Sequence, residues 1–98
     1  TIDPIVEEGY QLTVNAIKGK LILQVQLGNI SRFYADLLKC EYLYNKGLIS
    51  SVIYICFTSE FVKNHYSSNN VTVERALRET LLFREIIKVP ISFISIEI

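Results

Sequence analysis

The sequence contains no methionine, only two cysteines and one histidine, and no excess of either charge. Ten basic residues balance ten acidic ones, so the net charge does not imply non-specific binding to nucleic acid, and a nucleic-acid site would need locally clustered charge. Ninety-eight residues, half of them hydrophobic, predict a single domain (1–98) with a real core. The missing methionine predicts that the sequence is an excised or processed piece that lacks its N-terminal part.

The cysteines and the histidine lack the spacing of a zinc site. Cys40 and Cys56 fall inside predicted regular elements, so we expect buried, reduced thiols in a cytoplasmic protein. No run approaches the ~18 apolar residues that a membrane span needs, and no signal-peptide pattern opens the chain. We therefore expect no membrane partner.

Two segments, 10–17 and 20–27, alternate between polar and apolar residues, and this alternation predicts an antiparallel β-hairpin. Lys18-Gly19 provides a two-residue turn, since glycine adopts positive φ easily. We expect the hairpin to run directly into a helix, because Gly28 breaks the second strand and helical spacing follows.

Three polar residues interrupt the hairpin where a core strand would not need them: Asn15 on the first strand, and Gln24 and Gln26 on the second. With the expected turn, Asn15 faces Ile22 and lies diagonal to Gln24, about 7–8 Å away at Cα. The alternation of side chains then puts the three polar residues on one face around a shared point, close enough to bracket one ion.

The rest of the chain predicts an α/β fold. The expected elements are a loop over 1–9, helices over 30–46, 58–66 and about 73–81, a polar loop over 67–70, and strands over 51–57 and 89–98. The nearly continuous apolar run at 51–57 favours a central strand buried on both faces. A strand, a helix and a strand in this order indicate a right-handed crossover in a mixed central sheet, and we expect helices on both of its faces.

The hairpin residues form a longer motif with their neighbours. Asn15 is followed nine residues later by Gln24-Val25-Gln26, then by Leu27-Gly28-Asn29 and the aromatic pair Phe33-Tyr34. This motif resembles that of the BglII-type restriction endonucleases, a branch of the PD-(D/E)XK nucleases, which show Asp, eight residues, Glu-any-Gln, a hydrophobic residue, Gly-Asn and a helix with an aromatic pair. The segments at 42–47, 52–55, 73–75 and 89–91 also resemble the family, so the resemblance covers nearly the whole chain.

The resemblance implies a restriction-endonuclease-like fold, Mg²⁺-dependent hydrolysis of phosphodiester bonds in duplex DNA, and a two-fold homodimer that cuts both strands of a palindrome. It also implies roles for single residues. Asn15 and Gln24 occupy the metal-ligand positions, the Val25 carbonyl adds a ligand, and Gln26 helps to orient the attacking water.

The departures from the family are two isosteric changes from carboxylate to amide. Asn15 stands where the family has Asp, and Gln24 where it has Glu, while Gln26 agrees with the family. These changes preserve shape and remove two negative charges, so we expect weak or absent Mg²⁺ binding and a catalytically inactive form. Two explanations stay open, an engineered inactive form or a natural loss of catalysis, and the paired isosteric changes favour the first.

Several polar residues are candidate DNA contacts, each with an ordinary structural alternative. Asn29 either reads a base edge or caps the helix, and the remaining candidates either meet phosphate or a groove, or are only solvated. The full set is Lys18, Lys20, Asn29, Arg32, Ser67, Ser68, Asn69 and Asn70. The alternative functions are a non-catalytic DNA-binding or protein-interaction module on the same fold, and an α/β domain with no nucleic-acid role.

Overall fold

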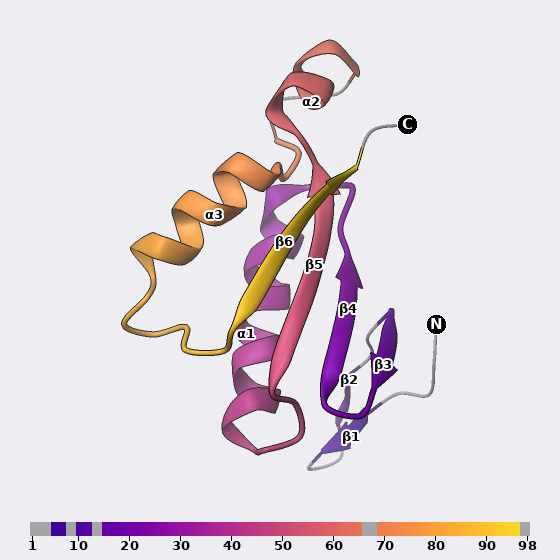
Figure 1. Ribbon diagram of the computed structural model, residues 1–98, viewed down its shortest axis with the longest axis vertical. Helices are drawn as coiled ribbons and strands as arrows, with labels where there is room; N and C mark the ends of the chain where they lie inside the picture. Colours follow the sequence, from indigo (N-terminus) through magenta and orange to yellow (C-terminus); the bar gives the residue numbers. More distant parts are fainter. Residues whose placement is uncertain (1–4, 8–9, 13–14, 66–68, 97–98) are drawn as a thin grey trace.

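The structure is a computed structural model of the chain, and it describes residues 5–7, 10–12, 15–65 and 69–96. Along these residues the chain forms β1 (Ile5–Glu7), β2 (Tyr10–Leu12), β3 (Ala16–Lys18), β4 (Leu21–Val25), α1 (Ile30–Asn45), β5 (Ser51–Phe57), α2 (Ser59–His65), α3 (Val73–Leu82) and β6 (Ile91–Ile96). The expected α/β fold class is therefore confirmed, and Figure 1 shows the sheet lying across α1.

The main sheet is mixed and has the strand order β3-β4-β5-β6. β3 pairs antiparallel with β4, whereas β4 with β5 and β5 with β6 are parallel. The predicted strand 51–57 coincides with β5 and lies inside the sheet, with a partner on each side (Figure 1). Its even-numbered residues Val52, Tyr54 and Cys56 are at most 1% exposed, as a core strand requires.

The N-terminal segment differs from the expectation. The expected loop over 1–9 contains β1, which pairs antiparallel with β2 in a separate two-stranded sheet. The expected strand 10–17 is therefore divided between β2 in that sheet and β3 in the main sheet. The β-branched Ile5 and Val6 favour an extended backbone that can pair with residues 10–12, and alternation within 10–17 gives no sign of this competing partner.

The register of the hairpin is also shifted from the expected one. Lys18 pairs with Leu21, so the turn residues are Gly19 and Lys20, and Ile22 faces Ile17 instead of Asn15. Gly19 adopts a φ of +61°, and the primed turns that join twisted strands require positive φ at their first central residue. Continuing this register by one pair past Ala16 and Leu23 places Asn15 opposite Gln24.

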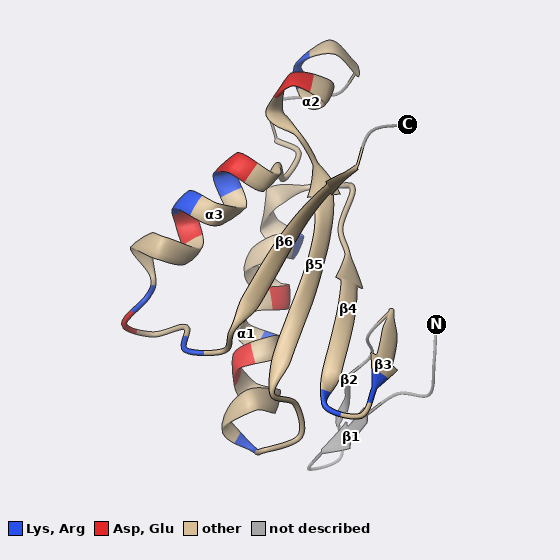
Figure 2. Cartoon of the chain, viewed as in Figure 1, with Lys and Arg blue, Asp and Glu red and all other residues tan. Residues whose placement is uncertain are grey.

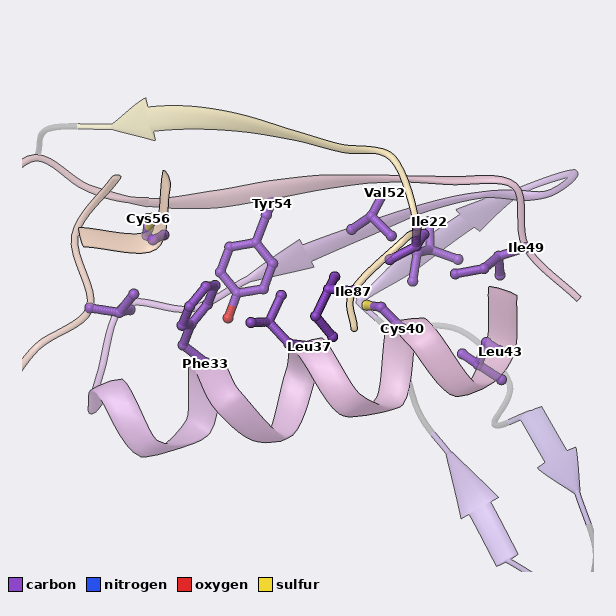
Figure 3. Close-up of a cluster of buried hydrophobic side chains, with 13 residues drawn as sticks. Ile22, Phe33, Leu37, Cys40, Leu43, Ile49, Val52, Tyr54, Cys56 and Ile87 are labelled. Atoms are coloured by element: carbon purple, nitrogen blue, oxygen red, sulfur yellow. The ribbon is translucent and has the colours of Figure 1, made fainter. Parts of the chain in front are cut away.

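One face of the sheet carries the core. From α1, the side chains of Phe33, Leu37, Cys40 and Leu43 pack against this face, and Figure 3 shows them pointing toward the strands. α3 lies on the same side, because its Ala76 belongs to the same buried cluster and Tyr34 Oη of α1 donates to Glu79 Oε1 at 3.0 Å.

The opposite face of the sheet is not sealed in the same way. Its odd-numbered side chains Leu23, Val25, Ile53 and Ile55 are only half-buried, while α1 and α3 both cover the even-numbered face. The odd-numbered Phe57 at the end of β5 is nevertheless 1% exposed, and its ring centroid lies 4.7 Å from that of Phe61 in α2. β5 is therefore buried along its even-numbered face and at Phe57, and the expected fold class is confirmed. Its continuous apolar run did not distinguish the two faces, since both carry β-branched or aliphatic residues.

The two cysteines lie in the core as free thiols. Cys40 is 1% exposed and Cys56 is 0% exposed. Burial away from water raises the pKa of each thiol to about 12, because the apolar surroundings disfavour the thiolate. They pack as small hydrophobic side chains, as the sequence predicted.

A buried carboxylate anchors the chain where it enters β6. Glu41 is 9% exposed, and its Oε1 accepts from the backbone N–H groups of Lys88 at 2.7 Å and Val89 at 2.9 Å. Its Oε2 accepts from Asn45 Nδ2 at 3.0 Å. Glu41 therefore joins the last turns of α1 to the segment that leads into β6.

We predict that Glu41→Ala lowers the free energy of unfolding by about 2–4 kcal/mol, because it leaves two backbone donors near the core without their acceptor. Urea unfolding measures the change. Glu85→Ala is the matched control, since Glu85 is exposed, and it should change the free energy by less than about 0.5 kcal/mol. Equal effects of the two substitutions would contradict the anchoring role of Glu41.

Candidate functional site

The hairpin brings Asn15 and Gln24 into direct contact. The backbone N–H of Asn15 donates to Gln24 Oε1 at 3.0 Å, and the backbone N–H of Val25 donates to Asn15 Oδ1 at 2.9 Å. Each side-chain oxygen thus accepts a hydrogen bond from the opposite side of the hairpin. The two amides close this end of the hairpin, and both oxygens that would face a metal ion already accept a hydrogen bond.

Gln24 also reaches inward to a carboxylate that sequence reasoning missed. Gln24 is 4% exposed, and its Nε2 donates to Asp36 Oδ1 at 3.2 Å. Tyr54 Oη donates to Asp36 Oδ2 at 2.6 Å, and Lys39 Nζ lies 3.5 Å from Asp36 Oδ1. A hydrogen-bonded chain, Asn15–Gln24–Asp36–Tyr54, therefore runs from β3–β4 through α1 to β5.

Helical spacing could have identified Asp36. It lies three residues after Phe33 and four before Cys40, so it shares the inward stripe of α1 with buried residues. Tyr54 carries a hydroxyl within an otherwise apolar strand and is 0% exposed, and such a group needs a partner. An acidic residue on the inward stripe and a buried hydroxyl on the facing strand together predict this contact.

The phenol of Tyr54 stays protonated and donates a hydrogen bond to Asp36. Burial raises its pKa far above the ordinary value for tyrosine, and the hydrogen bond to Asp36 and the charge of that carboxylate raise it further. Phe33 packs against the Tyr54 ring edge-on, with ring centroids 5.4 Å apart. Figure 3 shows the Tyr54 oxygen pointing from β5 toward α1, between Phe33 and Leu37.

Gln26 has a different environment from the other two polar residues. Its Oε1 accepts from the backbone N–H of Gly28 at 3.1 Å, and its own backbone N–H donates to Ile55 O at 2.9 Å. It lies just beyond β4, where the chain turns toward α1. Of the three predicted site residues, Asn15 and Gln24 thus bond to each other across the hairpin through a backbone N–H and a side-chain oxygen, while the side chain of Gln26 bonds to its own loop.

The candidate DNA-contact residues fall at two ends of the hairpin. Lys18 and Lys20 lie at its turn and are exposed, and Figure 2 colours the turn between β3 and β4 blue on both sides. Asn29 lies beyond the other end of β4, where its Oδ1 accepts from the backbone N–H of Ser31 at 2.8 Å as the N-cap of α1. Arg32 is exposed in the first turn of that helix.

Residues distant in sequence meet near the N-terminus of α1. Ile30 N donates to Asn69 O at 2.7 Å, and Asn70 Nδ2 donates to Leu27 O at 2.9 Å. Asn29 and Asn70 also form an isolated antiparallel bridge. The structure therefore brings Asn29, Asn69 and Asn70 together, whereas Ser67 and Ser68 lie outside the described residues.

A cleft between α2 and α3 carries further basic residues that the sequence analysis did not select as candidates. Lys63, Arg75 and Arg78 line it together with Asn70 and Glu74. Arg75 Nε lies 3.6 Å from Glu79 Oε1, and Figure 2 shows both basic and acidic residues on α3. The cleft is thus of mixed charge, and it adjoins the Asn29–Asn70 contact through Asn70.

The residues at the hairpin do not form a set of magnesium ligands. Mg²⁺ prefers charged oxygen ligands in octahedral geometry, and Asn15 and Gln24 offer neutral oxygens that already accept N–H donors. Within the described part of the chain, no group of three or more His, Cys, Asp or Glu residues is arranged to hold a metal. Asp36 is the nearby carboxylate, and its two oxygens bind Gln24 and Tyr54.

The α/β fold has a mixed sheet, and its antiparallel hairpin carries two polar residues of the motif and runs into a helix. These features are those of a restriction-endonuclease-like domain. Residues 2–96 match the family model described as restriction endonuclease BglII/BglIII. Because the match spans nearly the whole chain, the protein belongs to the BglII/BglIII restriction endonuclease family. A search of curated proteins and a search of solved structures each found no match.

Family membership confirms the resemblance inferred from the hairpin spacing. The chain is a restriction endonuclease domain, and DNA is the partner that this family implies. In the described part of the chain, none of the helices combines the length and the apolar character needed to cross a bilayer.

We predict that the chain binds Mg²⁺ weakly at the hairpin, because neither amide carries charge and both amide oxygens are engaged. Isothermal calorimetry should show tighter binding for Asn15→Asp with Gln24→Glu. The control, Asn64→Asp with Ser92→Asp, adds the same charge at exposed positions and should leave the affinity unchanged. Tight, stoichiometric binding by the unsubstituted chain would contradict the prediction.

Proposed function

We propose that this chain is a DNA-binding restriction endonuclease domain whose Mg²⁺-dependent cleavage is lost, and that it acts as a homodimer. One observation carries the proposal: Asn15 and Gln24 face each other at the position of the family motif, and their amide oxygens accept the backbone N–H groups of Val25 and Asn15. The fold of the site is therefore retained while its charge is absent.

The loss of charge matters because of the chemistry of phosphodiester hydrolysis. Cleavage at neutral pH ordinarily needs a divalent ion that stabilises negative charge and lowers the pKa of a bound water. Carboxylates at positions 15 and 24 would supply two charges beside the Val25 carbonyl, with Gln26 next in the chain. Amides at these positions keep the shape of the hairpin and remove the attraction for the ion.

A non-catalytic DNA-binding or protein-interaction module is the alternative on the same fold. The hydrogen bonds of Asn15 and Gln24 favour it, because both side-chain oxygens and the Gln24 nitrogen have partners without a metal ion. Carboxylates introduced at positions 15 and 24 distinguish the two functions by whether DNA cleavage appears. A neutralised nuclease regains cleavage, while a module that never cut DNA does not.

The proposed DNA surface is the region where Asn29, Arg32 and Asn70 meet beside the end of β4. The N-cap bond uses only Oδ1 of Asn29, so its Nδ2 can still donate to a phosphate or a base edge. Arg32 is exposed one turn away and Asn70 is tied to Leu27. These contacts place polar donors next to the hairpin that would otherwise carry the chemistry.

The proposed dimer surface is an apolar groove beside α1. Tyr34, Leu37, Leu38, Phe83, Ile86 and Ile87 line an apolar groove between α1 and the segment after α3. Leu38 is 67% and Ile86 is 66% exposed, which is unusual for large aliphatic side chains lining one groove. Cutting both strands of a palindrome needs a two-fold dimer, and a second copy would cover this groove.

We predict that Asn15→Asp with Gln24→Glu confers Mg²⁺-dependent cleavage of duplex DNA. The carboxylates match the amides in shape and can accept the same backbone N–H groups, while Gln24→Glu gives up the hydrogen bond to Asp36. Each single substitution should be far weaker than the pair, because ligands that act as a unit are not additive. The assay uses linear and supercoiled DNA with Mg²⁺ or Mn²⁺ against EDTA.

The unsubstituted chain and Asn64→Asp with Ser92→Asp are the controls, and neither should cut. Gel shifts in Ca²⁺ check that every variant still binds duplex DNA. If the double variant folds, dimerises and binds DNA without ever cutting it, the neutralised-nuclease proposal fails and the module is retained.

We also predict that Leu38→Glu weakens self-association at least about tenfold, because it places a charge inside the apolar groove. Sedimentation equilibrium gives the dissociation constant. Ile94→Glu is the control, since Ile94 is 47% exposed on β6, away from α1. A monomeric unsubstituted chain, or equal effects of both substitutions, would refute the proposed surface.

A further inference from the structure

Gln24 lies between two partners of opposite hydrogen-bonding character. The backbone N–H of Asn15 can only donate, and it meets Gln24 Oε1 at 3.0 Å. The Asp36 carboxylate accepts, and its Oδ1 meets Gln24 Nε2 at 3.2 Å. An amide suits this place because it has an acceptor at one end and a donor at the other, and the two partners determine its orientation.

A glutamate at position 24 would suit only one of these partners. Its carboxylate could accept from the Asn15 N–H, but its second oxygen would lie against Asp36 Oδ1 with no proton between them. Gln24 is 4% exposed and the Asp36 side chain is 13% exposed, so water screens the two charges poorly. The repulsion would turn the side chain at position 24 away from its place in the hairpin.

Asp36 is itself held in position. Its Oδ2 accepts from Tyr54 Oη at 2.6 Å, and Tyr54 is 0% exposed with Phe33 packed against its ring. Rotation of the Asp36 side chain would leave this buried hydroxyl without its acceptor, which is costly. Asp36 therefore cannot readily make room for a second carboxylate.

We propose that Asp36 is a positioning residue for the side chain at position 24, and that positions 24 and 36 form a matched amide–carboxylate pair. An asparagine at position 36 would accept from Tyr54 through its oxygen and donate to a glutamate at position 24 through its nitrogen. Exchanging both residues thus keeps all three hydrogen bonds, while either exchange alone breaks the match. The catalytic meaning of this pair rests on the proposed function, since position 24 matters for cleavage only if the hairpin is the nuclease site.

A double-mutant cycle in thermal unfolding tests the pairing without reference to activity. Gln24→Glu and Asp36→Asn should each lower Tm by roughly 5–15 °C, and the double variant should recover at least about half of the summed loss. Additive losses would overturn the proposal. If Gln24→Glu alone does not fold, folding of the double variant supports the pairing, and failure of both to fold contradicts it.

Gln26→Glu is the matched control, two residues further along the chain. The side chain of Gln26 bonds to Gly28 instead of Asp36, so its effect should simply add to that of Asp36→Asn. Equal coupling of both glutamines to position 36 would indicate a general charge effect and would overturn the specific pair.

A cleavage assay tests positioning separately from stability. Adding Asp36→Asn to Asn15→Asp with Gln24→Glu should raise kcat, per folded molecule at saturating Mg²⁺, at least about tenfold. An unchanged kcat would contradict the positioning role, because a merely structural residue alters only the folded fraction. If the stability cycle shows coupling while no variant cuts DNA, the proposed function is wrong and the pairing stands.

Discussion

One side-chain amide connects the three parts of this domain on which the site depends. Gln24 belongs to the hairpin, its nitrogen binds Asp36 of α1, and Asp36 accepts from Tyr54 of β5. Gln24 and Tyr54 are also register partners in the parallel pairing of β4 with β5. Because buried polar groups are costly when unpaired, this chain of hydrogen bonds favours one placement of the hairpin over α1.

Most of the secondary structure of the core follows from local patterns. The stripe of α1 and its Asn29 cap, and the apolar run of β5, predicted elements that match the structure within a residue or two. Local patterns could not give the hairpin register, because it depends on which two residues occupy the turn. Nor could they show β1, whose partner is another short strand of the same type.

The sequence predicted residues of the candidate site but not the hydrogen bonds that join them. The spacing from Asn15 to Gln24 identified the pair, and the shifted register brings them into direct contact. Asp36 was missed because the family motif, which extends to Phe33-Tyr34 and resumes at 42–47, includes no residue at position 36, while this contact is made by a helix residue twelve positions after Gln24. Contacts between elements depend on side-chain packing. The sequence indicates this contact only indirectly, through the buried hydroxyl of Tyr54 and the inward stripe of α1 that includes Asp36.

The central claim is that an intact DNA-binding nuclease fold carries a neutral hairpin in place of a metal site, and that the amide oxygens of this hairpin accept hydrogen bonds from its own backbone. Backbone NMR of the chain with a duplex that it binds, recorded in Mg²⁺ and in EDTA, tests this claim most directly. The account predicts DNA-induced shifts at Asn29, Arg32 and Asn70 that are the same in both conditions, with intact DNA throughout. Mg²⁺-dependent shifts at Asn15, Gln24 and Val25, or cleavage of the duplex, would contradict it.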